Sequence, residues 1–132
     1  MTDSGLYAIV LSLSRPKRVK VGKRGVSDFE KGTYIYIGSG RRNLSKRIAR
    51  HKRSEKTFRW HIDYFRNHCR WVGALVYTDI VDECELAMRI EKAISGARHH
   101  KRFGASDCRC KGHLVFTGVT AEAAMRMIEY KI

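Results

Sequence analysis

A stretch predicted to be helical, residues 44–51, combines apolar and basic side chains on one face. Spacings of three and four residues bring four side chains to that face: Leu44, Arg47, Ile48 and His51. A guanidinium on a face that meets the core costs several kcal/mol unless it meets an anion or lines a cleft. Arg47 could therefore hold a phosphate, or it could lay its stem on the core and keep its charged head in water.

Tyrosines occur on two segments upstream of this helix that have the pattern of strands. In TYIYIGSG, residues 33–40, Tyr34 and Tyr36 share one face and β-branched residues alternate on the other. The segment ends in Gly-Ser-Gly, which we interpret as a loop. A similar segment, GLYAIVLSL at residues 5–13, carries Tyr7. The pattern leaves open whether these phenols serve packing or chemistry.

The charge balance indicates a polyanionic partner. The 132 residues include 27 lysines and arginines against 13 aspartates and glutamates, a formal net charge of +14. Such an excess is typical of proteins that bind nucleic acid, and DNA is the partner we expect. The basic runs lack an apolar face with aromatic anchors, which disfavours a membrane surface. The candidate nucleic-acid-binding residues are Arg41, Arg42, Lys46, Arg50, Lys52 and Arg53.

Hydrophobic periodicity predicts the elements that must position these side chains. Strands are expected over residues 6–13, 33–37, 70–77 and 114–117, with a hairpin over residues 18–29. Helices are expected over residues 44–52, 58–65, 82–95 and 121–130, the first of them capped by Asn43. Because no helix joins the early strands, they must pair antiparallel. The sequence therefore predicts an α+β fold, a small and mostly antiparallel sheet flanked by helices, in a single domain of residues 1–132.

The sequence has no recognisable targeting signal. The N-terminal residues lack a basic region followed by an apolar core, and no apolar run approaches the roughly 20 residues that span a bilayer. We therefore expect an intracellular, cytoplasmic protein whose cysteines are reduced and packed as small buried thiols. A zinc site is an alternative, although the usual C-x2-C pair is missing; its ligands would be Cys84, Cys108, Cys110 and His113.

The tyrosine strands and the basic helix together resemble the motifs of the GIY-YIG nuclease superfamily. The sequence has GLY at residues 5–7 and YIG at residues 36–38. In that superfamily YIG precedes a short loop and the pattern L-x-x-R-x-x-x-H, which is matched in register by Leu44, Arg47 and His51. The resemblance implies a GIY-YIG-like fold, here with the predicted hairpin inserted between the two motifs.

Further segments resemble one archaeal-type branch, catalogued as domain of unknown function 123 and found alone or fused to DNA-repair enzymes. These segments are RWHIDYF (59–65), ECELA (83–87) and GASDCRCKGHL (104–114). The resemblance covers roughly residues 5–116. For this branch the resemblance implies the fold and a nuclease-like site. The wider superfamily resemblance implies a metal-dependent endonuclease that cleaves phosphodiester bonds in nucleic acid, with DNA repair as the expected setting.

The resemblance also implies roles for single residues. Tyr7 would be the base and Tyr36 its positioning partner; a phenol with an ordinary pKa near 10 needs nearby cations to lose its proton. Arg47 would clamp the phosphate through two parallel hydrogen bonds. His51 would be a secondary base or a hydrogen-bond partner.

A single Mg²⁺ (or Mn²⁺) is implied as well, held by a glutamate on a later helix and supplying a bound water as the nucleophile. Glu83 is favoured because it belongs to the ECELA segment, and Glu91 is the alternative because it ends an A-x-x-x-E pattern. The gap between Tyr7 and Tyr36 is 28 residues, and its extra length is the predicted hairpin of residues 18–29, which could cover or reshape such a site.

Two other functions stay open at this point. One is a non-catalytic nucleic-acid-binding domain that kept the fold, and the other is a small zinc-stabilised interaction module. Several polar residues in the branch-specific segments either extend the active site or act as buried hydrogen-bonding partners. These residues are His61, Asp63, Asp107 and His113.

Overall fold

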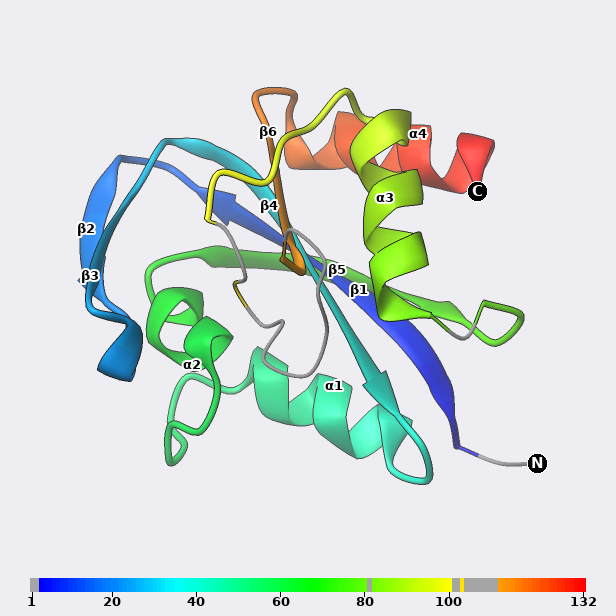
Figure 1. The fold of residues 1–132 in the computed structure, drawn as a ribbon, viewed down its shortest axis with the longest axis horizontal. Coiled ribbons are helices and arrows are strands. Elements are labelled where there is room, and N and C mark those ends of the chain that lie inside the picture. Colours follow the sequence, from blue (N-terminus) through cyan, green and yellow to red (C-terminus); the bar gives the residue numbers. More distant parts are fainter. Residues whose placement is uncertain (1–2, 81, 101–102, 104–111) are drawn as a thin grey trace.

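The computed structural model describes residues 3–80, 82–100, 103 and 112–132. Its main sheet is antiparallel, with the strand order β5-β1-β4-β6 (Figure 1). The strands are β1 (Gly5–Leu13), β4 (Gly32–Gly40), β5 (Arg70–Tyr77) and β6 (Leu114–Thr117). The helices are α1 (Leu44–Lys52), α2 (His61–Arg66), α3 (Glu83–Ala93) and α4 (Ala121–Lys131). The predicted α+β fold with an antiparallel sheet flanked by helices is confirmed.

The insertion between β1 and β4 forms the predicted hairpin. Strands β2 (Lys17–Lys20) and β3 (Val26–Phe29) pair antiparallel, and a short 3-10 helix, η1 (Gly22–Arg24), joins them. Val21 and Phe29 are buried, and both β2 and η1 contact α2. The hairpin therefore packs against α2 and forms a separate two-stranded sheet beside the main one.

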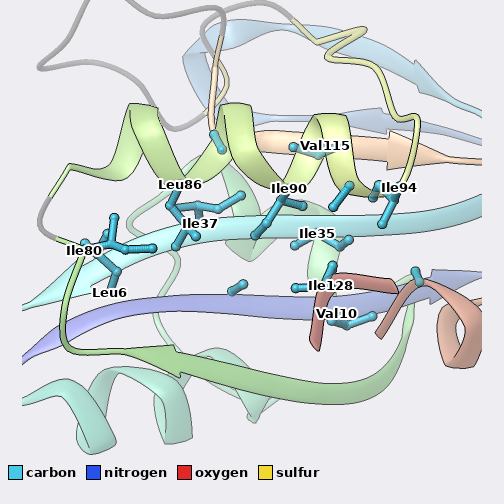
Figure 2. Packing of buried hydrophobic residues seen from close by; sticks show 14 of the residues in the cluster. Leu6, Val10, Ile35, Ile37, Ile80, Leu86, Ile90, Ile94, Val115 and Ile128 are labelled. Atoms are coloured by element: carbon cyan, nitrogen blue, oxygen red, sulfur yellow. The ribbon is translucent and has the colours of Figure 1, made fainter. Parts of the chain in front are cut away.

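One face of the main sheet packs against α3 and α4. Alternate residues of the two central strands, among them Val10, Ile35 and Ile37, point to this side and are fully buried. They meet Leu86 and Ile90 of α3 in an aliphatic core (Figure 2). This packing explains why the β-branched face of residues 33–37 is apolar.

The opposite face of the sheet carries the tyrosines and packs against α1, α2 and the hairpin. Tyr7, Tyr34 and Tyr36 belong to this second core, together with Leu44 of α1 and Phe65 of α2. The alternation predicted for residues 33–37 is therefore confirmed. All three tyrosines lie on the side of the sheet that α1 covers.

Two glycines of the YIGSG segment allow close approaches. Gly38 pairs with Tyr7 across β1 and β4, and a β-carbon on Gly38 would overlap the phenol of Tyr7. A β-carbon on Gly40 would lie 2.8 Å from the Cα atom of Leu44, at the start of α1. The segment is not the predicted loop, because β4 continues through Gly40. The glycines instead let the strand pass directly under Tyr7 and α1.

The start of α1 also differs from the prediction. Asn43 occupies the N-cap position, but among the described residues its side chain makes no capping hydrogen bond. The Asp3 carboxylate accepts the backbone N–H of Ser45 at 3.1 Å, and the Asp3 carbonyl accepts that of Leu44 at 3.1 Å. The N-terminal segment thus satisfies two of the free N–H donors at the start of this helix. Other boundaries shift slightly, since α2 begins at His61 and α3 ends at Ala93.

In the described part of the chain, every helix is too short or too polar to cross a membrane.

Candidate active site

Tyr7 of β1 and His51 of α1 form a buried pair. The Tyr7 phenol oxygen lies 2.7 Å from Nε2 of His51, and the two residues are 3% and 1% exposed. Burial, reinforced by the positive charge of Lys56, lowers the pKa of His51 to about 4. Burial also raises the pKa of Tyr7 above its ordinary value. At neutral pH the hydrogen bond therefore joins a protonated phenol to an uncharged imidazole.

Tyr36 and Trp60 enclose the same imidazole. The ring centroid of His51 lies 5.7 Å from that of Tyr36 and 5.4 Å from that of Trp60. Burial raises the pKa of Tyr36 as well, and the nearby Tyr7 adds to this effect. Both phenols thus stay protonated in the free protein. Ionisation of either one requires a further positive charge, such as a bound metal ion.

Arg47 lies on the same side of the sheet as Tyr7. Its Nη1 atom donates to the backbone carbonyl of Ser39 at 3.0 Å, and its guanidinium carbon lies 5.6 Å from the Trp60 ring centroid. Its charge acts to lower the pKa of Tyr7, although burial outweighs this effect. The guanidinium is half-buried at the end of β4, so it neither enters the core nor extends freely into water.

Glu83 reaches the same end of β4 from the start of α3. The Ser39 hydroxyl donates to Oε2 of Glu83 at 2.8 Å, so one residue contacts both Arg47 and Glu83. The Glu83 charge also raises the pKa of Tyr7 and Tyr36, after the larger effect of burial. A pocket of about 640 Å³ opens here, lined by Ser4, Gly5, Leu6, Ser39, Gly40, Arg41, Thr78, Ile80 and Glu83.

The alternative metal ligand, Glu91, has a different environment. Its Oε1 atom accepts a hydrogen bond from Nη2 of Arg98 at 2.9 Å, and these side chains are 22% and 7% exposed. Eight residues along α3 correspond to a rise of about 12 Å from Glu83. The structure therefore brings Glu83, rather than Glu91, to the end of the sheet that holds Tyr7 and Arg47.

The site offers a carboxylate, that of Glu83, as a ligand for a cation such as Mg²⁺, which needs few ligands from the protein. Within the described residues, no three His, Cys, Asp or Glu side chains are grouped as a metal cage. Mg²⁺ usually keeps several waters and binds one or two carboxylates together with phosphates of the substrate. Glu83, one-third exposed on the pocket wall, fits that mode of binding.

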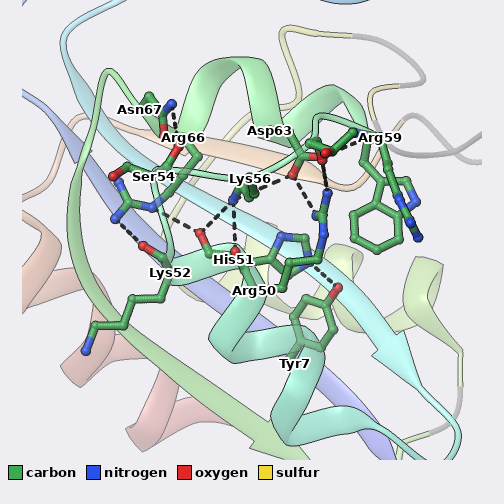
Figure 3. A network of polar contacts seen from close by, with 12 residues as sticks. Tyr7, Arg50, His51, Lys52, Ser54, Lys56, Arg59, Asp63, Arg66 and Asn67 are labelled. Atoms are coloured by element: carbon green, nitrogen blue, oxygen red, sulfur yellow. Dashed lines mark hydrogen bonds and ion pairs between the residues drawn. The ribbon is translucent and has the colours of Figure 1, made fainter.

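A polar network beside this site holds α1 in place (Figure 3). The carboxylate of Asp63 is fully buried and accepts two hydrogen bonds of 3.0 Å from the guanidinium of Arg50. It also accepts the backbone N–H groups of Arg59 and Trp60, at 2.7 and 3.0 Å. Asp63 is thus a buried hydrogen-bonding partner that connects α1 to the loop before α2.

The C-terminal carbonyls of α1 are satisfied by cations (Figure 3). Nζ of Lys56 donates to the carbonyls of Arg50 and His51, at 3.0 and 3.1 Å. The guanidinium of Arg66 donates to the carbonyls of His51 and Lys52. Positive charge at a helix C-terminus is favourable. These contacts fix the last turn of α1, and with it the position of the His51 ring against Tyr7.

Five of the six candidate nucleic-acid-binding residues are exposed on and beside α1: Arg41, Arg42, Lys46, Lys52 and Arg53. The sixth is Arg50, whose guanidinium forms hydrogen bonds with the carboxylate of Asp63. The guanidinium carbon of Arg50 lies 4.4 Å from the Trp60 ring centroid. A shallow pocket of about 400 Å³ extends this surface, lined by Arg50, Arg53, Glu55, Lys56, Thr57 and Arg59. Lys20 and Lys23 of the hairpin are also exposed, and they line a pocket with Tyr64.

Sequence reasoning missed two residues that organise the site. Ser39 connects Arg47 to Glu83, and Trp60 lies against His51 and the guanidiniums of Arg47 and Arg50. The serine between the two glycines of YIGSG was the available signal for the first. The tryptophan inside RWHIDYF was the signal for the second, since large aromatic residues in a basic segment often stack on arginine.

The remaining polar candidates have separate positions. His113 lies beside Glu83 and Cys84, with its Nδ1 atom 3.3 Å from Oε1 of Glu83. The His61 ring packs 5.4 Å from that of Phe103. Three of the candidates lie outside the described residues: Asp107, Cys108 and Cys110.

The chain was compared with known proteins. The family described as Domain of unknown function DUF123 matches residues 6–131. The search of curated proteins and the search of solved structures gave no match.

Proposed function

The chain belongs to the DUF123 family. Because Ser39 also joins Arg47 to Glu83 at one end of the sheet, we propose that the chain is a metal-dependent endonuclease of the GIY-YIG type. Its substrate is nucleic acid, most simply DNA, and the reaction is hydrolysis of a phosphodiester bond. DNA repair inside the cell is the setting that we propose for this activity.

The observation that supports this proposal is the double role of Ser39. Its carbonyl accepts from Arg47 and its hydroxyl donates to Glu83, so a cation and a carboxylate are held at one end of the sheet. Tyr7 pairs with Gly38 in the adjoining strand. The guanidinium of α1 and the carboxylate of α3 are thus joined through one residue of β4, beside the strand that carries the Tyr7 phenol, and these are groups that hydrolysis of a phosphodiester can use.

Each residue has a task that its environment permits. Arg47 binds a non-bridging phosphate oxygen and stabilises the charge that grows on it in the transition state. Glu83 would hold Mg²⁺, which when bound would act as a Lewis acid and lower the pKa of a bound water. The uncharged His51 keeps the Tyr7 phenol oriented by their shared hydrogen bond. Tyr36 packs against His51 and keeps water away from this pair.

The test is nicking of DNA by the full chain in Mg²⁺ or Mn²⁺, over branched, nicked, damaged and single-stranded substrates. Glu83→Gln should abolish cleavage, because it removes the charge that holds the metal. Glu91→Gln is the matched control and should cleave like the wild type, since that carboxylate is paired with Arg98. If Glu91→Gln abolished cleavage and Glu83→Gln did not, the proposed assignment would be wrong.

A non-catalytic nucleic-acid-binding domain is the second candidate. The observation that favours it is the burial of Tyr7 and Tyr36, because neither phenol contributes to the wall of the pocket that Glu83 lines. In that case wild-type protein would bind nucleic acid and would cut nothing in the panel with either metal.

A further inference from the structure

Two aromatic rings beside α2 connect two basic pockets. The rings are those of Phe58, in the loop before α2, and Tyr64, on α2 itself. Their centroids lie 4.9 Å apart and their planes cross at 70°, so the edge of one ring meets the face of the other. Phe58 is 38% exposed, so a substantial part of this apolar ring meets solvent.

The two pockets border on this aromatic pair. The first lies between the hairpin and α2, has a volume of about 590 Å³, and is lined by Lys20, Gly22, Lys23 and Tyr64. The second is the shallow pocket of about 400 Å³ beside α1, whose lining includes Thr57 and Arg59. These two residues are the sequence neighbours of Phe58. Phe58 therefore joins the wall of the second pocket to the tyrosine that lines the first.

The hairpin is held against α2, so its lysines have a fixed place. Both β2 and η1 contact α2 (Figure 1). Gly22 has a φ of +49°, and a β-carbon there would lie 3.1 Å from the Tyr64 hydroxyl oxygen. Val21, the residue before it, is fully buried. Lys20 and Lys23 thus extend from an element that is packed on both its backbone and its apolar side chains.

The exposed charge along these pockets is mostly positive. Among the described residues that line them, Glu55 is the one acidic side chain. Two of the cations, Arg50 and Lys56, are paired with the buried Asp63. The other four are exposed: Lys20, Lys23, Arg53 and Arg59.

An exposed aromatic ring between cations matches the chemistry of an unpaired nucleic-acid strand. Bases outside a duplex have free faces that stack on aromatic side chains, and cations along the path bind the phosphates. In a duplex those faces are covered by neighbouring base pairs, and a protein reaches base edges and the backbone instead. The Phe58 ring therefore favours a single strand, whereas the lysines and arginines alone would not distinguish the two.

We propose that an unpaired strand of nucleic acid lies across this surface, with one base stacked on the Phe58 ring. Tyr64 supports that ring from α2. The phosphates on either side of the base are bound by the four exposed cations of the two pockets. The substrate class is then nucleic acid with a single-stranded segment. This inference rests on the proposed function, because it takes nucleic acid as the substrate, but it does not require cleavage.

The experiment is binding of oligothymidylate by the full chain in EDTA, measured by fluorescence anisotropy beside a duplex of equal length. Phe58→Leu keeps an apolar side chain and removes the ring, so it should weaken binding of oligothymidylate by about 5- to 150-fold, the range for loss of one stacked base. Duplex affinity should not change, and Phe58→Tyr should bind both like the wild type. Tyr130→Leu is the matched control, because Tyr130 is an exposed aromatic residue on α4.

The hairpin lysines have a separate effect. Replacing Lys20 and Lys23 by alanine should lower the slope of log affinity against log salt for oligothymidylate by about 0.7 for each phosphate no longer neutralised. The same change at Lys92 and Arg126, exposed on α3 and α4, should leave the slope as it is in the wild type. Equal slopes for the two double variants would remove the hairpin from the binding surface.

A further measurement uses wild-type protein and does not depend on whether the variants fold. An abasic oligonucleotide has the same phosphates without bases, so it should bind at least about 5-fold more weakly than oligothymidylate. Equal affinity for the two strands would overturn the inference. So would displacement of oligothymidylate by an oligoglutamate of the same charge as readily as by oligothymidylate itself, because the surface would then recognise charge alone.

The two proposals fail in different ways. EDTA removes divalent metal, so binding is measured whether or not the chain cleaves. If Phe58→Leu bound oligothymidylate like the wild type while nicking in Mg²⁺ persisted, this inference would be wrong and the proposed nuclease would stand. If wild-type protein stacked the base but nicked nothing in the panel, the binding surface would stand and the proposed reaction would be wrong.

Discussion

The phenol of Tyr7 and the imidazole of His51 lie 2.7 Å apart, although the residues are separated by 44 positions in the sequence. The pair connects the centre of the sheet to the last turn of α1. Because both side chains are buried, each polar atom depends on the other for its hydrogen bond.

Replacing Tyr7 by phenylalanine removes one oxygen and keeps the ring. The buried Nε2 atom of His51 then loses its hydrogen-bond partner, so we expect a loss of about 1–3 kcal/mol in the free energy of unfolding. Urea denaturation measures this loss. Tyr130→Phe is the control, because Tyr130 is 90% exposed and should change stability little. In a nicking assay the Tyr7 variant should stay folded and lose turnover.

The uncharged state of His51 predicts how stability depends on pH. Its pKa falls from 6.5 to about 4 in the folded protein, because of burial and the charge of Lys56. Between these values the unfolded chain binds a proton that the folded chain does not. The free energy of unfolding should therefore decrease as pH falls from about 6.5 towards 4, by at most about 1.4 kcal/mol per pH unit.

Urea denaturation from pH 7 to pH 4.5 measures this slope, and His51→Gln should reduce it. Burial lowers the pKa of His61 and His100 too, so part of the slope should remain in the variant. A slope that is the same in His51→Gln and wild type would show that His51 is not held uncharged.

The ion pair between Arg50 and Asp63 predicts a large effect on stability. Asp63→Asn leaves Arg50 and Lys56 without their buried counter-charge, which should lower the free energy of unfolding by about 3–5 kcal/mol. Thermal or urea denaturation measures this change in the free energy of unfolding. Asp28→Asn is the matched control, since Asp28 pairs with Arg18 at the surface, where water screens the charges, and it should change stability little. Equal effects of the two changes would contradict the assigned role of Asp63.

The exposed cations around α1 predict salt-dependent binding of nucleic acid. The triple variant Arg42→Ala, Lys46→Ala and Arg53→Ala should bind duplex DNA more weakly. The slope of log affinity against log salt should fall by about 0.9 for each phosphate that the variant no longer neutralises. Fluorescence anisotropy at several salt concentrations provides both quantities.

The control for this variant removes the same charge from the other side of the sheet, at exposed positions of α3 and α4: Arg89, Lys92 and Arg126. Replacing these three by alanine should leave the salt slope as it is in the wild type. If the two triple variants had equal slopes, the binding face would lie elsewhere.

Local patterns were sufficient to predict most of the fold. The alternation of residues 33–37 separated the tyrosine face from the aliphatic face, because side chains on a strand alternate regardless of what covers them. The spacing of Leu44, Arg47 and His51 likewise predicted one helical face, and His51 does lie against Tyr7. These inferences rest on the geometry of a single element.

Contacts between distant segments could not be predicted in the same way. Glu83 and Glu91 lie on one helix. The position of Arg98 in the fold shows that Glu91 is the one whose carboxylate is paired with an arginine. Arg50 was assigned to nucleic acid because its sequence neighbours are cations, whereas its partner Asp63 lies 13 residues away across a loop. The Asp3 cap on α1 depends on how the N-terminal segment crosses the helix.

The sharpest prediction for catalysis concerns Arg47. A clamp on the reacting phosphate stabilises the transition state more than the bound substrate, whereas binding is shared among many cations. Arg47→Ala should therefore lower the single-turnover cleavage rate by about a hundredfold, equivalent to about 3 kcal/mol, and leave DNA affinity nearly unchanged.

Arg47→Lys keeps the charge but cannot make two parallel hydrogen bonds to phosphate, so it should recover only part of the rate. Arg126→Ala, an exposed change on α4, controls for the loss of one positive charge and should cleave at the wild-type rate. Rates measured at saturating protein separate the chemical step from binding. If Arg47→Ala weakened DNA affinity and the cleavage rate to the same extent, Arg47 would be one more binding cation and not the clamp on the reacting phosphate.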